Sequence, residues 1–301
     1  MKIVFFGTPD FAVPSLQVLN DSEHEVLAVV TAPDKQRGRG MQVTHTPVKE
    51  FAMANGIPVL QPNDLKDDDF IEHLIDLDAD LFVVVAFRIL PKEVFDIPTY
   101  GAFNLHASIL PQYRGAAPIQ WALINGEPET GITTFFLNER VDTGNIILQK
   151  RIQIRETDDY GSLYDVMSVM GAELVLKTVT LIDYGNVFVH EQEPELASPA
   201  PKITKEMCAV DWRKDASEIN NLVRGLSPAP GAFFIHKEKI YKLYKTKIAG
   251  HDHLNPGEFR ETKHEIFVGT GNGILQILEL QAEAGKRMTA DEFLRGHSFL
   301  K

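Results

Sequence analysis

The chain opens with Lys2-Ile3-Val4-Phe5-Phe6, then Gly7-Thr8-Pro9-Asp10, then an amphipathic run from Phe11 to Leu19. This order predicts a strand, a glycine turn and a helix. Apolar β-branched runs follow at 26–31 and 81–86, with a helical pattern at 48–55 between them. Strands that alternate with helices in this way indicate an α/β domain built on a parallel-rich, Rossmann-like sheet.

The later sequence predicts a second domain. Runs at 103–105, 133–137 and 146–154 predict further strands, and 160–184 predicts a long helix. Residues 190–206 are dense in Pro, Glu, Ser and Ala without apolar periodicity, which is typical of a linker. A helical stretch at 216–226 and short apolar runs broken by Gly and Pro then favour a small β-barrel. We therefore expect a catalytic domain at 1–189, a linker at 190–206 and a second domain at 207–301.

Composition limits the class of protein. The chain has 301 residues, a net charge of −12 and a single cysteine, Cys208, so an internal disulfide is excluded and a reducing, cytoplasmic location fits best. No stretch approaches the roughly 20 apolar residues of a membrane span, and we expect no membrane association. Residues 207–301 hold 14 Lys and Arg against 12 Asp and Glu, so the acidic excess lies in 1–206. This asymmetry predicts different partners for the two parts.

A dinucleotide site is disfavoured at the first glycine turn. The G-x-G-x-x-G fingerprint needs a second glycine where the pyrophosphate approaches, and here that position is Pro9. The phosphate-binding pattern of nucleoside triphosphatases is also missing from the sequence. We therefore expect the reacting residues to lie outside the first glycine turn.

Asn104-Leu105-His106 ends a predicted strand. Side chains at i and i+2 of a strand face the same way, so Asn104 and His106 project together at the carboxyl end, where open α/β sheets place their active sites. An amide and an imidazolium donate well to an oxyanion, and His handles a proton near neutral pH. Taken alone, the pair is better explained as a core-satisfied Asn and a solvent-facing His than as a reaction centre.

Three further segments follow in order: Ser108-Ile109-Leu110-Pro111, Tyr113-Arg114-Gly115 and Asp142-Thr143-Gly144. With the Asn-x-His strand, this order resembles that of the folate-dependent formyltransferases, and the branch that acts on methionyl-tRNA in particular. The resemblance implies transfer of a formyl group from 10-formyltetrahydrofolate, without a metal. It assigns catalysis to Asn104, His106 and Asp142, with Asp142 paired to His106. An isolated Asp-Thr-Gly would fit a plain turn.

The resemblance also implies a folate pocket. It places the pterin against Arg88, Ile89 and Leu90 and against the segment Ser108, Ile109, Leu110 and Pro111. The methionyl-tRNA branch usually has Tyr-Gly where this chain has Phe87-Arg88, and Arg-Ile-Leu is closer to the enzymes that formylate glycinamide ribonucleotide. The departure puts the detailed pterin contacts in doubt, and Arg88 fits a surface residue equally well.

The acceptor is predicted by features outside this centre. Lys35, Arg37 and Arg39 lie in a basic, glycine-bearing loop that resembles the tRNA-reading insertion of the methionyl-tRNA branch. Lysines between 237 and 247 alternate along a predicted strand pair with Tyr241 and Tyr244 interleaved, and the family carries an oligonucleotide-binding (OB-like) barrel there. We expect a monomer that acts on initiator methionyl-tRNA. A nucleotide-linked amino sugar, glycinamide ribonucleotide and a catalytically silent binding module stay open as alternatives.

Overall fold

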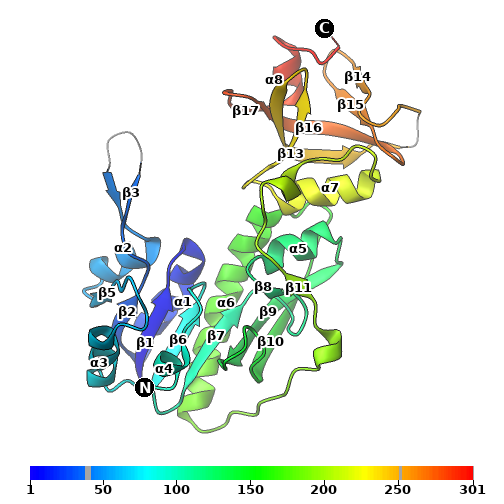
Figure 1. Cartoon of the computed structure of the whole chain (residues 1–301). Coiled ribbons are helices and arrows are strands. Elements are labelled where there is room, and N and C mark those ends of the chain that lie inside the picture. The colour runs from blue at the N-terminus through cyan, green and yellow to red at the C-terminus, as the bar shows by residue number, and fades with distance from the viewer. Residues whose placement is uncertain (38–41, 251–252, 301) are drawn as a thin grey trace. The chain divides into compact units, whose positions relative to one another are not determined.

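The computed structural model describes residues 1–37, 42–250 and 253–300 of the chain. They form two compact units (Figure 1). The first unit comprises 1–115, 131–152 and 164–199, and the second comprises 116–130, 153–163 and 200–301. Each unit is described by itself.

The first unit is built on a seven-stranded sheet in the order β10-β9-β7-β6-β1-β2-β5. The pairs β1 with β2, β1 with β6, β2 with β5 and β6 with β7 are parallel, and β9 runs antiparallel to β7. The predicted parallel-rich sheet is thus confirmed. The strands are β1 (Lys2–Gly7), β2 (Glu25–Val30), β5 (Val59–Leu60), β6 (Leu81–Val85), β7 (Ala102–His106), β9 (Glu129–Phe136) and β10 (Ile146–Gln153).

Helices cover both faces of this sheet. Phe82 and Val84 of β6 share a buried cluster with Leu74 and Val94, which come from α3 and α4. On the other face Leu105 of β7 lies under Gly171 of α6, so closely that a Cβ at Gly171 would come within 2.5 Å of it. The helices are α1 (Val13–Asn20), α2 (Pro47–Ala54), α3 (Asp68–Asp76), α4 (Lys92–Phe95) and α6 (Tyr160–Asp183), and the 3-10 turn η1 (Asp10–Ala12) precedes α1.

The predicted basic loop is partly a hairpin. Strands β3 (Lys35–Arg37) and β4 (Gln42–Thr44) pair antiparallel, Lys35 with Thr44 and Arg37 with Gln42. β3 stands off from the rest of the blue N-terminal region (Figure 1). The prediction of a loop was therefore wrong for Lys35 and Arg37, since the hydrogen-bond pairing of Gln36 with Val43 continues the ladder between them.

The second unit holds a six-stranded antiparallel sheet in the order β12-β13-β16-β15-β14, with β17 paired to β16. Its core is aromatic: Phe234 stacks on Tyr241 at 5.4 Å, and Phe259 stacks on Phe299 at 4.5 Å. The expected small β domain is confirmed as a domain built on antiparallel strands. Its strands are β12 (Ala232–His236), β13 (Lys239–Ile248), β14 (Phe259–Glu261), β15 (Ile266–Gly269), β16 (Ile274–Ala282) and β17 (Arg287–Thr289).

A bulge in β13 breaks the predicted alternation of lysines. The register against β16 shifts between Leu243 and Lys245, so that Leu243 and Tyr244 are both buried. Lys242 donates instead to the carbonyl of Pro230 at 2.9 Å. The register shifts again between Lys245 and Thr246, and on this strand only Lys245 and Lys247 are exposed lysines at i, i+2 spacing.

Helix α5 (Pro118–Ile124) belongs with the second unit and packs on α7 (Ala216–Gly225). The contact is close, because a Cβ at Gly225 would lie 2.7 Å from the Ile124 side chain. The boundaries 189 and 207 stay predictions. The remaining short elements are β8 (Arg114–Gly115), η2 (Pro194–Leu196), β11 (Pro199–Ala200), η3 (Glu206–Cys208) and α8 (Ala290–Leu294).

Candidate active site

Asn104 and His106 lie at the carboxyl end of β7, on the face opposite to Leu105. His106 is buried, and Asn104 is half-buried. The Oδ1 atom of Asn104 is buried and has no hydrogen-bond partner among the described residues. Burying an amide oxygen without a hydrogen-bond partner costs free energy of folding. This atom is therefore an acceptor that a substrate group can use.

The two ring nitrogens of His106 have different surroundings. Nε2 lies 2.8 Å from the carbonyl oxygen of Tyr113, and because a carbonyl only accepts, Nε2 carries a proton and donates it. Nδ1 lies 3.8 Å from Oδ2 of Asp142, which is ion-pair range but longer than a hydrogen bond. Nδ1 is therefore the ring nitrogen that faces the Asp142 carboxylate.

Asp142 is held rigidly on the loop before β10. Its Oδ2 accepts a hydrogen bond from the backbone N–H of Gly115 at 2.8 Å, and its side chain is only 10% exposed. Its φ of +54° is in the left-handed region, where Asp is among the few tolerated side chains. Gly144, two residues on, has no room for a side chain, because a Cβ would lie 1.7 Å from the carbonyl oxygen of Phe136.

Gln192 supports the same loop from a segment predicted to be a linker. Its Nε2 donates to the carbonyls of Asp142 at 2.9 Å and Gly144 at 2.8 Å, while its Oε1 accepts from Arg114 at 2.6 Å. Nearby, His190 pairs with Ile146 as an isolated bridge. No local pattern marks this role, since Gln192 lies in a Pro- and Glu-rich stretch without periodicity.

The segment from Ser108 to Pro111 is tied to β9 and β10 by Thr133 and Gln149. The hydroxyl of Thr133 donates to the Ser108 carbonyl at 2.7 Å and accepts from the Leu110 N–H at 3.2 Å and from Gln149 at 3.0 Å. Gln149 also donates to the carbonyl of Leu110 at 2.8 Å. Ser108, Ile109 and Leu110 are buried, and Pro111 is half-buried. Their hydrogen bonds fix the backbone of the predicted folate segment.

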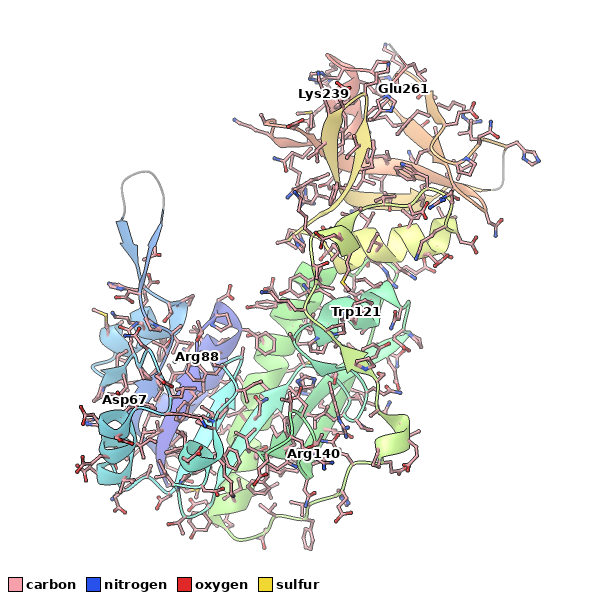
Figure 2. All side chains as sticks on the ribbon, viewed as in Figure 1. Asp67, Arg88, Trp121, Arg140, Lys239 and Glu261 are labelled. Atoms are coloured by element: carbon pink, nitrogen blue, oxygen red, sulfur yellow. The ribbon has the colours of Figure 1, made fainter. Side chains whose placement is uncertain are left out.

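The second predicted folate segment follows β6. Arg88 (Figure 2) donates to the carbonyls of Pro62 at 2.8 Å and Asn63 at 3.0 Å, and its guanidinium lies 5.3 Å from the centre of the Phe87 ring. Leu90 is buried in the core, whereas Ile89 is 74% exposed. Arg88 and Ile89 are thus both exposed, but the Arg88 guanidinium is already bonded to two backbone carbonyls.

The predicted tRNA-binding residues lie apart from these contacts in the sequence. Lys35 and Arg37 belong to β3, and Arg39 lies outside the described residues. Within the described part of the chain, no group of three or more His, Cys, Asp or Glu residues could hold a metal ion. No helix in that part is long and apolar enough to cross a membrane.

Comparison with known proteins identifies the family of this chain. The formyl transferase model matches residues 1–179, and the formyl transferase C-terminal domain model matches 202–298. The chain belongs to the formyl transferase family. It is 46% identical to methionyl-tRNA formyltransferase of Caldanaerobacter subterraneus subsp. tengcongensis over 99% of this formyl transferase and 97% of the relative. Identity to the Flavobacterium johnsoniae protein of the same name is 44%, with the same coverage.

Solved structures share the fold at lower identity. An N-formyltransferase from Helicobacter canadensis, in complex with folinic acid and dTDP-3-aminofucose, matches with a TM-score of 0.71 and 21% identity, over 96% of this formyl transferase and all of that chain. HypX from Aquifex aeolicus, in complex with tetrahydrofolic acid, matches with a TM-score of 0.69 and 20% identity, over all of this chain and 48% of HypX. At these identities the likeness shows the fold.

Proposed function

We propose that this enzyme transfers the formyl group of 10-formyltetrahydrofolate to the free amino group of methionyl-initiator tRNA, giving N-formylmethionyl-tRNA for translation initiation. The observation that carries the proposal is the 44–46% identity to methionyl-tRNA formyltransferases across both units of the chain. The family uses a formylated reduced folate, and the lone Cys208 agrees with a reducing cytoplasm.

Asn104 orients the two reacting groups. The unpartnered Oδ1 is an acceptor at a buried position, suited to an N–H of the incoming amine. The amide also carries two donors, which suit the oxygen of the formyl group as its negative charge grows. In this role Asn104 holds the amine nitrogen against the formyl carbon and stabilises the tetrahedral arrangement that follows.

His106 and Asp142 manage the charge and the proton. With Nε2 fixed on the Tyr113 carbonyl, Nδ1 faces the reacting centre with the Asp142 carboxylate beside it. The amine nitrogen bonds to the formyl carbon to give the tetrahedral intermediate, which collapses as the bond to the folate nitrogen breaks, and one net proton passes from the amine to that nitrogen. The Asp142 carboxylate, held by the Gly115 N–H, is placed to relay this proton through water.

The folate segments fit a flat ring with polar edges. The folate supplies the activated formyl group. Ile89 offers an exposed apolar surface, and the Ser108–Pro111 backbone is fixed by Thr133 and Gln149. The side chain of Arg88 is already bonded to Pro62 and Asn63, so we assign it to holding the loop that precedes the pocket.

The basic hairpin and the second unit suit a polynucleotide acceptor. Lys35, Arg37 and Arg39 carry the charge that a phosphate backbone requires, and Lys245 and Lys247 are exposed on the second unit. A small sugar acceptor has no need of these groups. Transfer to a nucleotide-linked amino sugar is the competing proposal, since solved sugar formyltransferases share the fold.

Radiolabelled formyl transfer from 10-formyltetrahydrofolate tests the proposal. Charged initiator methionyl-tRNA should become labelled, while uncharged tRNA and a dTDP-linked amino sugar should not. Removal of residues 35–40 should lower transfer to tRNA greatly. Efficient transfer to the sugar, unchanged by the deletion, would select the competing proposal.

A further inference from the structure

Four side chains join the two ends of the β3–β4 hairpin to the body of the first unit. Asp34 directly precedes β3, His45 directly follows β4, Lys49 lies in the first turn of α2, and Gln61 follows β5. Asp34 Oδ2 accepts from Lys49 Nζ at 2.6 Å, and Asp34 Oδ1 accepts from Gln61 Nε2 at 3.0 Å. The entry to the hairpin is thus anchored to two other elements.

The contacts close into a network. Lys49 Nζ also donates to Gln61 Oε1 at 2.7 Å, so Asp34, Lys49 and Gln61 are each bonded to the other two. His45 Nδ1 lies 3.1 Å from Asp34 Oδ2, which ties the exit of the hairpin to its entry. Hydrogen bonds from Lys49 and then Gln61 hold the pKa of Asp34 far below its ordinary value of 3.8.

The residues that flank the hairpin on either side are also hydrogen-bonded to one another and to α2. Gln61 Nε2 donates to the carbonyl of Ala32 at 2.8 Å, and the hydroxyls of Thr31 and Thr46 lie 2.8 Å apart. Thr46 caps α2 by accepting from the N–H of Lys49 at 3.1 Å. The last residues before the hairpin and the first after it are therefore fixed to one another.

Exposure separates this network from an ordinary surface ion pair. The side chains of Lys49 and Asp34 are 15% and 25% exposed, against 46% and 89% for the surface pair of Lys2 and Asp78. Exposed pairs contribute little because water and salt screen them, whereas shared, partly buried hydrogen bonds to a charge are stronger. The network has the properties needed to hold the hairpin in one direction.

We infer that Asp34, Lys49 and Gln61 are positioning residues that aim the basic hairpin at the phosphodiester backbone of the acceptor. The inference rests on the proposed function, in which the hairpin engages a polynucleotide acceptor. These residues belong to the hairpin base and take no part in the contacts of Asn104, His106 and Asp142. Their loss therefore weakens acceptor binding and leaves the chemical step intact.

The test compares Asp34→Asn with Asp78→Asn in the full chain. Asp78→Asn is a matched control, because it removes a carboxylate bonded to a lysine at 3.1 Å and Asn tolerates the φ of +47° at that position. Steady-state transfer is measured with methionyl-tRNA and 10-formyltetrahydrofolate varied in turn. Amide hydrogen exchange in β3 and β4 is measured alongside.

For Asp34→Asn we expect the KM for tRNA to rise about tenfold, which corresponds to one strong charged hydrogen bond. The kcat and the KM for folate should stay within twofold of the parent, and the β3 and β4 amides should exchange faster. Gln61→Met, which keeps the ion pair, should raise the KM for tRNA about threefold and provides a milder variant if Asp34→Asn folds poorly.

Two kinetic results would overturn the inference: an unchanged KM for tRNA in both variants, or a fall in kcat with both KM values raised. An unchanged exchange rate in β3 and β4 would also overturn it. Failure of the parent chain to formylate methionyl-tRNA would instead remove the proposed function, so the two failures are distinguishable.

Discussion

The Nδ1 atom of His106 faces Oδ2 of Asp142 across 3.8 Å, while its Nε2 is fixed on the Tyr113 carbonyl at 2.8 Å. Nε2 donates to the Tyr113 carbonyl, and the gap from Nδ1 to Asp142 exceeds direct hydrogen-bond length. The pair is thus arranged to share its charge with a substrate group or a water molecule.

His106→Ala should lower kcat at least about 100-fold, the usual scale for a group that handles a proton or stabilises an oxyanion. His73→Ala, an exposed histidine on α3 of the same unit, is the control. Single-turnover formyl transfer at saturating substrates measures the chemical step. A loss in His106→Ala no greater than in the control would contradict the assignment.

Gln192→Leu should lower kcat by about 10- to 100-fold, because it releases the carbonyls of Asp142 and Gly144 and lets the Asp142 loop shift. Glu191→Ala, the exposed neighbour, controls for changes to the segment itself. The two variants are compared by kcat and by thermal unfolding. Equal kcat values in both would show that the Asp142 loop keeps its place without Gln192.

Gly144→Ala should destabilise the first unit by about 1–3 kcal/mol, the usual cost of forcing extra atoms into a packed site. The new Cβ would lie 1.7 Å from the Phe136 carbonyl oxygen, so the backbone must move. Gly56→Ala has a φ of +70° but open space around its Cβ, and it reports the smaller cost of the left-handed backbone alone. Denaturant unfolding measures the loss of unfolding free energy in both variants. A smaller loss in Gly144→Ala than in Gly56→Ala would contradict the prediction.

His24 should make the stability of the chain fall as pH drops below its ordinary pKa of 6.5. Burial, and then the N-terminal ammonium 3.3 Å away, lower the pKa of His24 more than Asp183 raises it. The unfolded chain therefore binds this proton at a higher pH than the folded chain, and the stability present above 6.5 is lost as pH falls through the folded pKa.

The free energy of unfolding at pH 7.5 and at pH 5.5 measures this effect. His24→Gln should show a smaller difference between the two pH values than the parent chain. His73→Gln, an exposed histidine, should leave the difference as it is in the parent. An identical pH dependence in parent and His24→Gln would refute the prediction.

Most regular elements could be predicted because their apolar periodicity is strong. β6, β7 and α6 lie where the sequence indicates, within a residue or two at each end. β3 and β4 were missed because Lys-Gln-Arg has no apolar alternation, and their pairing depends on the chain meeting itself. The bulge at Leu243 was missed because it depends on the register against β16.

The residues of the candidate site were likewise only partly predictable from the sequence. The i, i+2 spacing of Asn104 and His106 was enough to place both on one face of β7. The contacts of Gln192, Thr133 and Gln149 join segments far apart in the chain, and no local pattern marks them. Likewise, nothing in the sequence shows that the Arg88 side chain is bonded to Pro62 and Asn63.

Formyl transfer to initiator and elongator methionyl-tRNA, measured side by side with 10-formyltetrahydrofolate as donor, tests the central claim most directly. We expect the parent chain to N-formylate initiator methionyl-tRNA rapidly and elongator methionyl-tRNA far more slowly. In His106→Ala both reactions should be almost completely lost. Absence of N-formylmethionyl-tRNA with the parent chain, or undiminished formation with His106→Ala, would contradict it.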